Sequence, residues 1–179
     1  MPDLAIPGLA LPNLTDASTP ALIFLAFIIV QRLSELVIAK RNTARLMARG
    51  AWEVGANHYP VMVALHTSWI LALVVFGFDQ PVSTFWLVIF VLLQGLRLWI
   101  LGTLGDRWTT RIILIDEPLV TSGPFRFLRH PNYTLVVAEI AVAPLVLGLT
   151  WVAVVFSVLN AAMLFWRISV EGRALRPEG

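Results

Sequence analysis

The chain has 179 residues, of which 58% are hydrophobic and 13% are charged, and its mean hydropathy is +0.81. A soluble domain of this length is about half apolar and roughly 25% charged, so this composition predicts an integral membrane protein with a single domain over residues 1–179. The absence of cysteine excludes disulfides, thiolate metal sites and a cysteine nucleophile. Three scattered histidines and a formal charge of +2 give no reason to expect a metal site or a nucleic-acid partner.

The first half of the chain is expected to contain an irregular N-terminal segment and three membrane spans. Residues 1–19 hold three prolines and neither Lys nor Arg, whereas a signal peptide begins with a positively charged region. Pro20 suits the start of a helix, because its missing N–H would be unpaired there in any case. Within residues 20–104 we expect three spans, at 20–38, 61–78 and 82–104.

The second half, residues 105–179, is expected to hold a polar loop, a helical hairpin and a charged tail. The β-branched run at 111–115 predicts a short strand or an extended surface segment. Two apolar segments, 133–147 and 150–166, are joined by Gly148 and Leu149. As helices they would each rise roughly 24 Å, which is less than the roughly 30 Å of a bilayer core. They predict a tight hairpin in a locally thinned bilayer.

The distribution of Lys and Arg predicts the orientation in the membrane. If the N-terminus lies outside, the cytoplasmic side receives the basic cluster at 40–49 and the arginines of the later loop and tail. These are Arg107, Arg111, Arg126, Arg129, Arg167, Arg173 and Arg176. The outer side then has none, and only Arg32 and Arg97 lie within spans. This bias favours five spans with the C-terminus in the cytoplasm over a four-span arrangement with a half-inserted hairpin.

Three polar side chains near the cytoplasmic face are candidates for chemistry. Arg167 and Glu171 are four residues apart after the last span, so a helix presents them on one face. The structural alternative is an arginine that extends to the membrane surface beside a solvated carboxylate. His130 lies where the loop meets the fourth span, and its structural alternative is an interfacial anchor.

Glu139 is a carboxylate within an apolar segment, where a charge requires a partner. One interpretation pairs it structurally with Arg32 or Arg97. The other has it face a polar cofactor cavity or position a ligand.

Three motifs in order resemble the isoprenylcysteine carboxyl methyltransferase family, and the resemblance covers roughly residues 107–175. The motifs are Leu-Val-Thr-Ser-Gly-Pro-Phe at 119–125, Arg-His-Pro-x-Tyr at 129–133, and Arg-Ile-x-x-Glu-x-x-x-Leu at 167–175. Residues 58–60 and 107–111 are similar to bacterial members that methylate lipid-like phenols or hydroxypyrones, which suggests a bacterial inner membrane. Three positions depart from the family pattern: Phe125 replaces a usual Tyr, Leu135 a usual Gly, and Gly172 a second acidic residue.

The resemblance implies an S-adenosylmethionine-dependent methyltransferase. Its all-α fold would have five transmembrane helices and a cytoplasmic cofactor pocket between the loop before the fourth helix and the C-terminal helix. Arg167 and Glu171 would be catalytic, and Arg167 would also bind the acceptor. Apart from the resemblance, the position of Glu139 within an apolar segment makes it a further candidate for contact with the acceptor. The cofactor-binding residues would be Thr110, Glu117, Pro118, Leu119, Val120, Phe125, His130, Pro131, Asn132, Tyr133 and Glu171.

Methyl transfer mainly requires alignment of the donor with an anionic acceptor oxygen. A carboxylate needs no base, whereas a phenol or enol needs Glu171 or Glu139 as one. The acceptor would be an isoprenoid, polyketide or other lipid that enters from the bilayer, among the membrane lipids. Two alternatives are an NADPH-dependent reductase of the sterol-reductase-like kind and a non-catalytic scaffold or transporter. The oligomeric state is left open.

Overall fold

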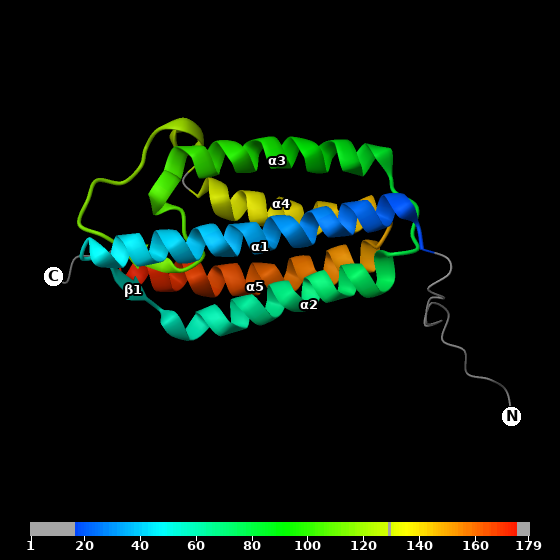
Figure 1. The fold of residues 1–179 in the computed structure, drawn as a ribbon. Coiled ribbons are helices and arrows are strands. Elements are labelled where there is room, and N and C mark those ends of the chain that lie inside the picture. Colours follow the sequence, from blue (N-terminus) through cyan, green and yellow to red (C-terminus); the bar gives the residue numbers. More distant parts are fainter. Residues whose placement is uncertain (1–16, 129, 175–179) are drawn as a thin grey trace, which may run out of the picture.

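The computed structural model describes residues 17–128 and 130–174, which form a bundle of α-helices with a common long axis (Figure 1). The predicted all-α fold is confirmed. The helices are α1 (Thr19–Ala48), α2 (Tyr59–Gly77), α3 (Thr84–Leu104), α4 (Pro131–Val146) and α5 (Thr150–Ala174). Three short 3-10 helices lie between them: η2 (Ala56–His58), η3 (Gly105–Arg107) and η4 (Gly123–Arg126).

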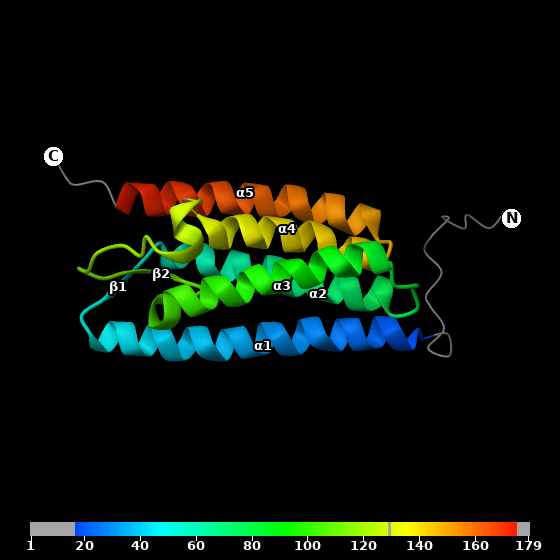
Figure 2. The ribbon, with the colours of Figure 1, turned by 90° about the horizontal axis from the view of Figure 1, so that it is seen from above.

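Helix α4 is the central element, because it packs against α3 on one side and α5 on the other. Figure 2 shows α1 and α5 on opposite sides of the bundle, with the other helices between them. Helix α2 packs against both α5 and α1. The largest apolar cluster includes Ile28, Trp69, Leu73, Ile140 and Val152, one or more from each of α1, α2, α4 and α5.

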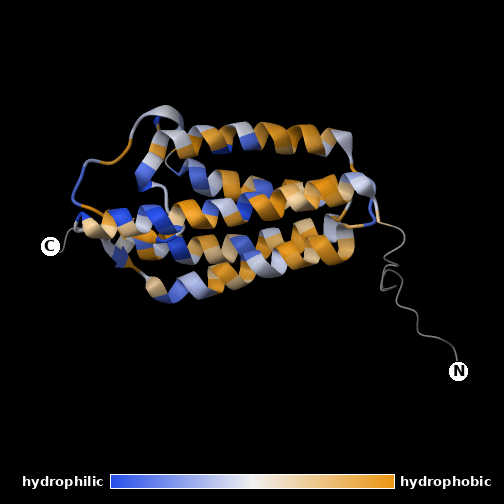
Figure 3. Ribbon diagram, viewed as in Figure 1, coloured by the Kyte–Doolittle hydropathy of each residue, from blue (hydrophilic) through white to orange (hydrophobic). Residues whose placement is uncertain are grey.

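Four helical segments are long and apolar enough to cross a membrane. They are Thr19–Ala48, Ala56–Gly77, Thr84–Arg107 and Thr150–Gly172, while Pro131–Val146 is a shorter apolar helix. Large apolar side chains such as Phe85, Leu92 and Phe165 are exposed on the outside of the bundle, as lipid contact requires. Polar residues gather at the end that carries β1 (Trp52–Val54) and the C-terminal part of α5 (Figure 3). The count of five spans and their orientation stay predictions.

Two helices extend well beyond their predicted ends. Helix α1 continues past residue 38 to Ala48, and α5 continues past residue 166 to Ala174. At 1.5 Å per residue α5 is about 37 Å long, so the prediction of two short hairpin arms was correct for α4 and wrong for α5. Lys, Arg, Glu and Ala are good helix formers, so a helix need not end where its apolar stretch ends.

The extended run predicted at 111–115 forms strand β2 (Ile112–Leu114), which pairs antiparallel with β1. Trp52 lies opposite Leu114 in this pairing. Asn42 of α1 also donates hydrogen bonds to the carbonyl oxygens of Gly105 (3.1 Å) and Trp108 (2.9 Å). The polar segment after α3 is therefore hydrogen-bonded both to α1 and to β1.

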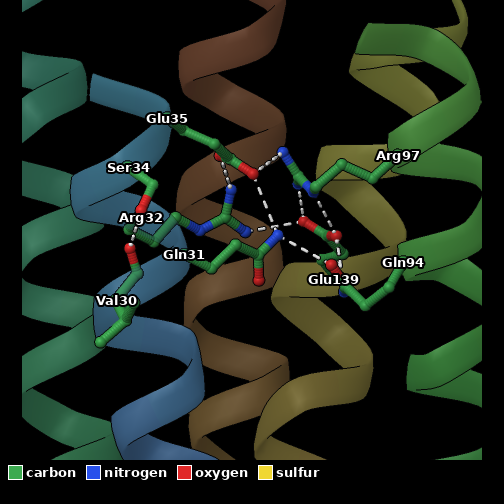
Figure 4. A network of polar contacts seen from close by, with 8 residues as sticks. All are labelled: Val30, Gln31, Arg32, Ser34, Glu35, Gln94, Arg97 and Glu139. Carbon is green, nitrogen blue, oxygen red and sulfur yellow. Dashed lines mark hydrogen bonds and ion pairs between the residues drawn. The ribbon is translucent and has the colours of Figure 1, made fainter. Parts of the chain in front are cut away.

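A network of four charged side chains joins α1, α3 and α4 inside the bundle (Figure 4). Glu139 of α4 is fully buried, and its carboxylate accepts hydrogen bonds from Arg32 (2.6 Å) and from Arg97 Nε (2.8 Å). Arg97 Nη2 also forms an ion pair with Glu139, and its Nη1 lies 2.8 Å from Glu35. Arg32 in turn pairs with Glu35 at 3.0 Å. Glu139 thus pairs with both arginines, which is the structural interpretation of this residue.

Two glutamines complete the network. Gln31 Nε2 donates to Glu35 (2.9 Å) and to Gln94 Oε1 (2.7 Å), while Gln94 Nε2 donates to Glu139 (3.1 Å). Two cations and two anions therefore compensate one another, and the amides bridge them. A buried group of charges is tolerated in an apolar bundle only when it is paired and hydrogen-bonded in this way.

Glu139→Gln should destabilise the bundle strongly, because it leaves Arg32 and Arg97 with a surplus positive charge in an apolar surrounding. We expect a loss on the order of 3 kcal/mol, measured as a fall in the thermal unfolding temperature of the detergent-purified protein. The control is Asp106→Asn, which removes a carboxylate from an exposed pair with Arg45 and should cost less than about 1 kcal/mol. Equal effects of the two changes would show that the network does not stabilise the fold.

Candidate active site

A cavity of about 170 Å³ lies among the five helices and the segment after η3. One end is lined by the polar residues Thr110, Asn132, Tyr133 and Arg167. Its walls carry apolar side chains, which include Met62, Val63, Val136, Met163 and Leu164. Arg32, Glu35 and Arg97 of the charged network also line it. The cavity therefore has polar groups from two regions of the bundle and an apolar lining between them.

Tyr133 connects the two helices that carry the predicted motifs. Its hydroxyl donates a 2.5 Å hydrogen bond to Glu171 and accepts a 3.1 Å hydrogen bond from Arg167 Nε. Tyr133 lies in the first turn of α4, which begins at Pro131, a favoured residue at that position. Arg167 and Glu171 are four residues apart in α5, so they lie on the same helix face. Packing of α4 on α5 brings the three residues together.

Arg167 is held by neutral partners and not by a carboxylate. Its Nη1 donates to the carbonyl oxygen of Thr110 (2.8 Å) and contacts the sulfur of Met62 (3.0 Å). Its guanidinium carbon lies 5.5 Å from the centre of the Tyr133 ring. The residue is 7% exposed, and within residues 17–128 and 130–174 no carboxylate forms an ion pair with it. A buried positive charge without a direct ion pair thus lines the cavity, and the Glu171 carboxylate lies on the other side of the Tyr133 hydroxyl.

The other predicted residues of the second motif surround Tyr133. The His130 ring stacks on the Tyr133 ring, with 5.3 Å between centroids and 16° between planes. Pro131 is buried at the helix start, and Asn132 lines the cavity. Arg129 of the same motif lies outside the described residues, as does Leu175 of the third.

The predicted residues 117–120 lie apart from this cavity, on the loop between β2 and η4. Glu117 forms ion pairs with Arg107 and Arg49, and hydrogen bonds from these two guanidinium groups lower its pKa. Arg107 also donates to the carbonyl oxygen of Pro118 at 2.5 Å. Leu119 is 76% exposed, and Val120 follows it on the same loop. The structure thus does not bring this group to the residues around Arg167.

Phe125 also belongs to a different environment from the one expected. It packs on an apolar cluster that contains Ile100, Trp108 and Leu135, and it does not line the cavity. Glu139 does not line the cavity either, although its partners Arg32 and Arg97 do.

Sequence reasoning missed several residues that line the cavity. Met62 was not expected to contact Arg167, and neither His66 of α2 nor Asn160 of α5 was proposed for the site. The signal for His66 and Asn160 was present, because polar side chains inside apolar spans are costly and usually face a partner or a cavity. Met62 carried no such signal, since its role depends on how α2 packs against α5.

Comparisons with known proteins agree with the motifs. The model of the isoprenylcysteine carboxyl methyltransferase (ICMT) family matches residues 86–177, which are 92 of the 179 residues. The uncharacterized protein YpbQ of Bacillus subtilis is 34% identical over 160 residues, which cover 86% of this chain and 95% of that protein. An uncharacterized protein of Haemophilus influenzae is 26% identical over 116 residues, covering 62% of this chain and 67% of its own length.

No solved structure was found to match the chain. The family match nevertheless spans α3 from Trp86, α4 and α5, and it includes all three residues that meet at the Tyr133 hydroxyl. It also covers more than half of the chain. The protein therefore belongs to the ICMT family.

Proposed function

We propose that this membrane protein is an S-adenosylmethionine-dependent methyltransferase that modifies a carboxylate or hydroxyl oxygen of a lipophilic acceptor. The observation that carries the proposal is the position of Arg167: a buried guanidinium, held by Tyr133 and Thr110, at one end of an apolar-walled cavity. Arg stays charged at any physiological pH and binds carboxylates well. The family assignment makes methyl transfer the reaction that this arrangement serves.

The residues around Tyr133 suit the cofactor that ICMT-family methyltransferases generally use. The Glu171 carboxylate receives one hydrogen bond from the described part of the chain, that of Tyr133, so most of its lone pairs stay available for an ammonium group. The stacked rings of His130 and Tyr133 offer an aromatic surface to a nucleobase. When bound there, S-adenosylmethionine would supply the methyl group from its sulfonium, and the rest of the cofactor would leave as a neutral thioether. Residues 117–120 would belong to the same site only after the loop moves toward α5.

The Arg167 guanidinium would bind the acceptor oxygen and keep it anionic. A carboxylate acceptor requires nothing more, because it is already charged. A hydroxyl acceptor has to lose its proton, and the Tyr133 hydroxyl is bonded to Glu171 at 2.5 Å. The acceptor proton would pass to the Tyr133 oxygen as Tyr133 passes its own proton to Glu171, which ends protonated. Glu139 is a poorer base, because Arg32 and Arg97 both hold its carboxylate.

The apolar walls of the cavity favour a lipid tail as the remainder of the acceptor. Met62, Val63, Val136 and Leu164 line the space next to Arg167. The walls are themselves helices whose outer faces are apolar, so an acceptor would pass between them from the bilayer. We place the site at the cytoplasmic face of a bacterial inner membrane, on the basis of the charge distribution and the bacterial relatives.

The class of the enzyme is tested by calorimetric titration of S-adenosylmethionine and of NADPH, separately, into the purified protein. We expect micromolar binding of S-adenosylmethionine, or of its demethylated product, and none of NADPH. Binding of NADPH alone would point to a reductase. If the folded protein binds neither, it is not an enzyme of either kind.

Arg167→Ala should abolish methyl transfer and largely spare cofactor binding, because in this proposal the guanidinium binds the acceptor while Glu171 and the His130 and Tyr133 rings bind the cofactor. Transfer is measured with S-adenosylmethionine labelled at the methyl group and a lipid extract as acceptor, and binding by calorimetry. Arg45→Ala is the matched control, since Arg45 is exposed and pairs with Asp106; it should leave both readouts unchanged. Normal turnover of Arg167→Ala would remove the assigned role.

Tyr133→Phe separates acceptor binding from proton removal, because it keeps the ring stacked on His130 and deletes only the hydroxyl. With a long-chain phenol as acceptor we expect transfer to fall roughly a hundredfold. With a fatty acid, which needs no base, the loss should stay below about tenfold. Equal losses with the two acceptors would show that the hydroxyl only positions Arg167 and Glu171.

A further inference from the structure

The cavity continues along α5, away from Arg167. Asn160, Met163, Leu164 and Arg167 all line it, and their spacing of three, four and seven residues places them on one helix face. Asn160 is seven residues before Arg167, which is about 10 Å along the helix. The side chains between these two polar residues are apolar.

Asn160 is a buried polar group whose amide nitrogen has no partner in the described residues. The residue is 3% exposed, and its Nδ2 receives no hydrogen-bond acceptor from the protein. Buried side-chain donors are almost always paired, so each exception requires an explanation. Two further residues that line the cavity show the same feature, at Arg32 Nε and Trp108 Nε1. All three atoms are N–H donors, so each would be satisfied by an acceptor oxygen of a ligand.

The charges that line the cavity define which acceptor fits. Arg32 and Arg97 are compensated by Glu35 and Glu139, so this region offers no free positive charge. A second anion would be buried there without a counter-charge, which is costly. A neutral oxygen satisfies the Asn160 amide without that cost. The expected ligand group is therefore a carbonyl, ether or hydroxyl oxygen.

We propose that Asn160 forms an inner subsite that binds a neutral oxygen of the acceptor, about two helical turns from the oxygen that is methylated. This inference rests on the proposed function, because it assumes that the acceptor occupies this cavity. Acceptors with an oxygen at this distance are selected, since an all-hydrocarbon chain leaves the Asn160 donor unpaired. Sites that hydrogen-bond a substrate discriminate strongly against analogues that lack the bonding group.

The test measures acceptor binding without methyl transfer. Palmitic acid and a series of oxo-palmitic acids, whose keto group moves along the chain, are titrated into the protein in lipid nanodiscs, with empty nanodiscs as the reference for partitioning. The carboxylate should bind at Arg167 in every case. One keto position should improve the affinity about two- to tenfold over palmitic acid, the effect of one neutral hydrogen bond.

Asn160→Leu, which has a similar side-chain volume, should abolish the preference for the keto compound and leave the affinity for palmitic acid equal or higher. Its thermal unfolding temperature should not fall, because the change removes an unpaired donor. Met163→Leu is the matched control on the same helix face and should keep the preference.

The possible negative results distinguish a failure of the inner subsite from a failure of the proposed function. If wild-type protein binds palmitic acid in an Arg167-dependent way but shows no preference for any keto position, the inner subsite is refuted and the proposed function stands. A preference that survives Asn160→Leu would refute the role of Asn160. If no fatty acid binds while S-adenosylmethionine does, the cavity is not the acceptor site and the inference fails with that part of the proposal.

Discussion

The compensated charge network among α1, α3 and α4 is the constraint on which the rest of the structure depends. Apolar packing between membrane helices is weakly specific, because lipid tails are as apolar as the side chains they replace. Buried ion pairs are directional, and breaking one exposes a charge to an apolar surrounding. Glu139 therefore fixes the position of α4 along its axis against α1 and α3. Tyr133 is six residues earlier in the same helix, so the network also determines where its hydroxyl meets α5.

The three arginines that line the cavity differ in what surrounds them. Arg32 and Arg97 face carboxylates and are neutralised, whereas Arg167 is held by a carbonyl oxygen, a hydroxyl group and a sulfur. Neutral partners orient a guanidinium without cancelling its charge. This contrast supports the proposal that Arg167 binds an anionic acceptor, whereas the ion pairs of Arg32 and Arg97 serve the fold.

Composition was sufficient to predict the helical bundle, and the family resemblance of the motifs placed Tyr133, Arg167 and Glu171 in one site. The run at 111–115 allowed either a short strand or an extended segment, and it forms a strand at 112–114. Composition and motifs were insufficient for features that depend on tertiary packing. For Glu139 they allowed either pairing with Arg32 or Arg97 or contact with a ligand, and only the arrangement of helices shows that it pairs with both arginines. The helix ends at Ala48 and Ala174 were missed because charged residues form helices as readily as apolar ones. Spacing could not place residues 117–120, since a loop is positioned by its contacts.

The departures from the family pattern become intelligible in three dimensions. Phe125, where the family usually has Tyr, and Leu135, where it usually has Gly, pack in the same apolar cluster. Leu135 is fully buried and fills space that a glycine would leave open, and an aromatic ring without a hydroxyl suits such a neighbour. Both departures thus lie in one apolar cluster beside η4. Gly172, in place of a second acid, is exposed, and a side chain there would meet no atom within 4 Å. The missing carboxylate therefore lies outside the packed interior, and Glu171, bonded to Tyr133, is the acid that the site retains.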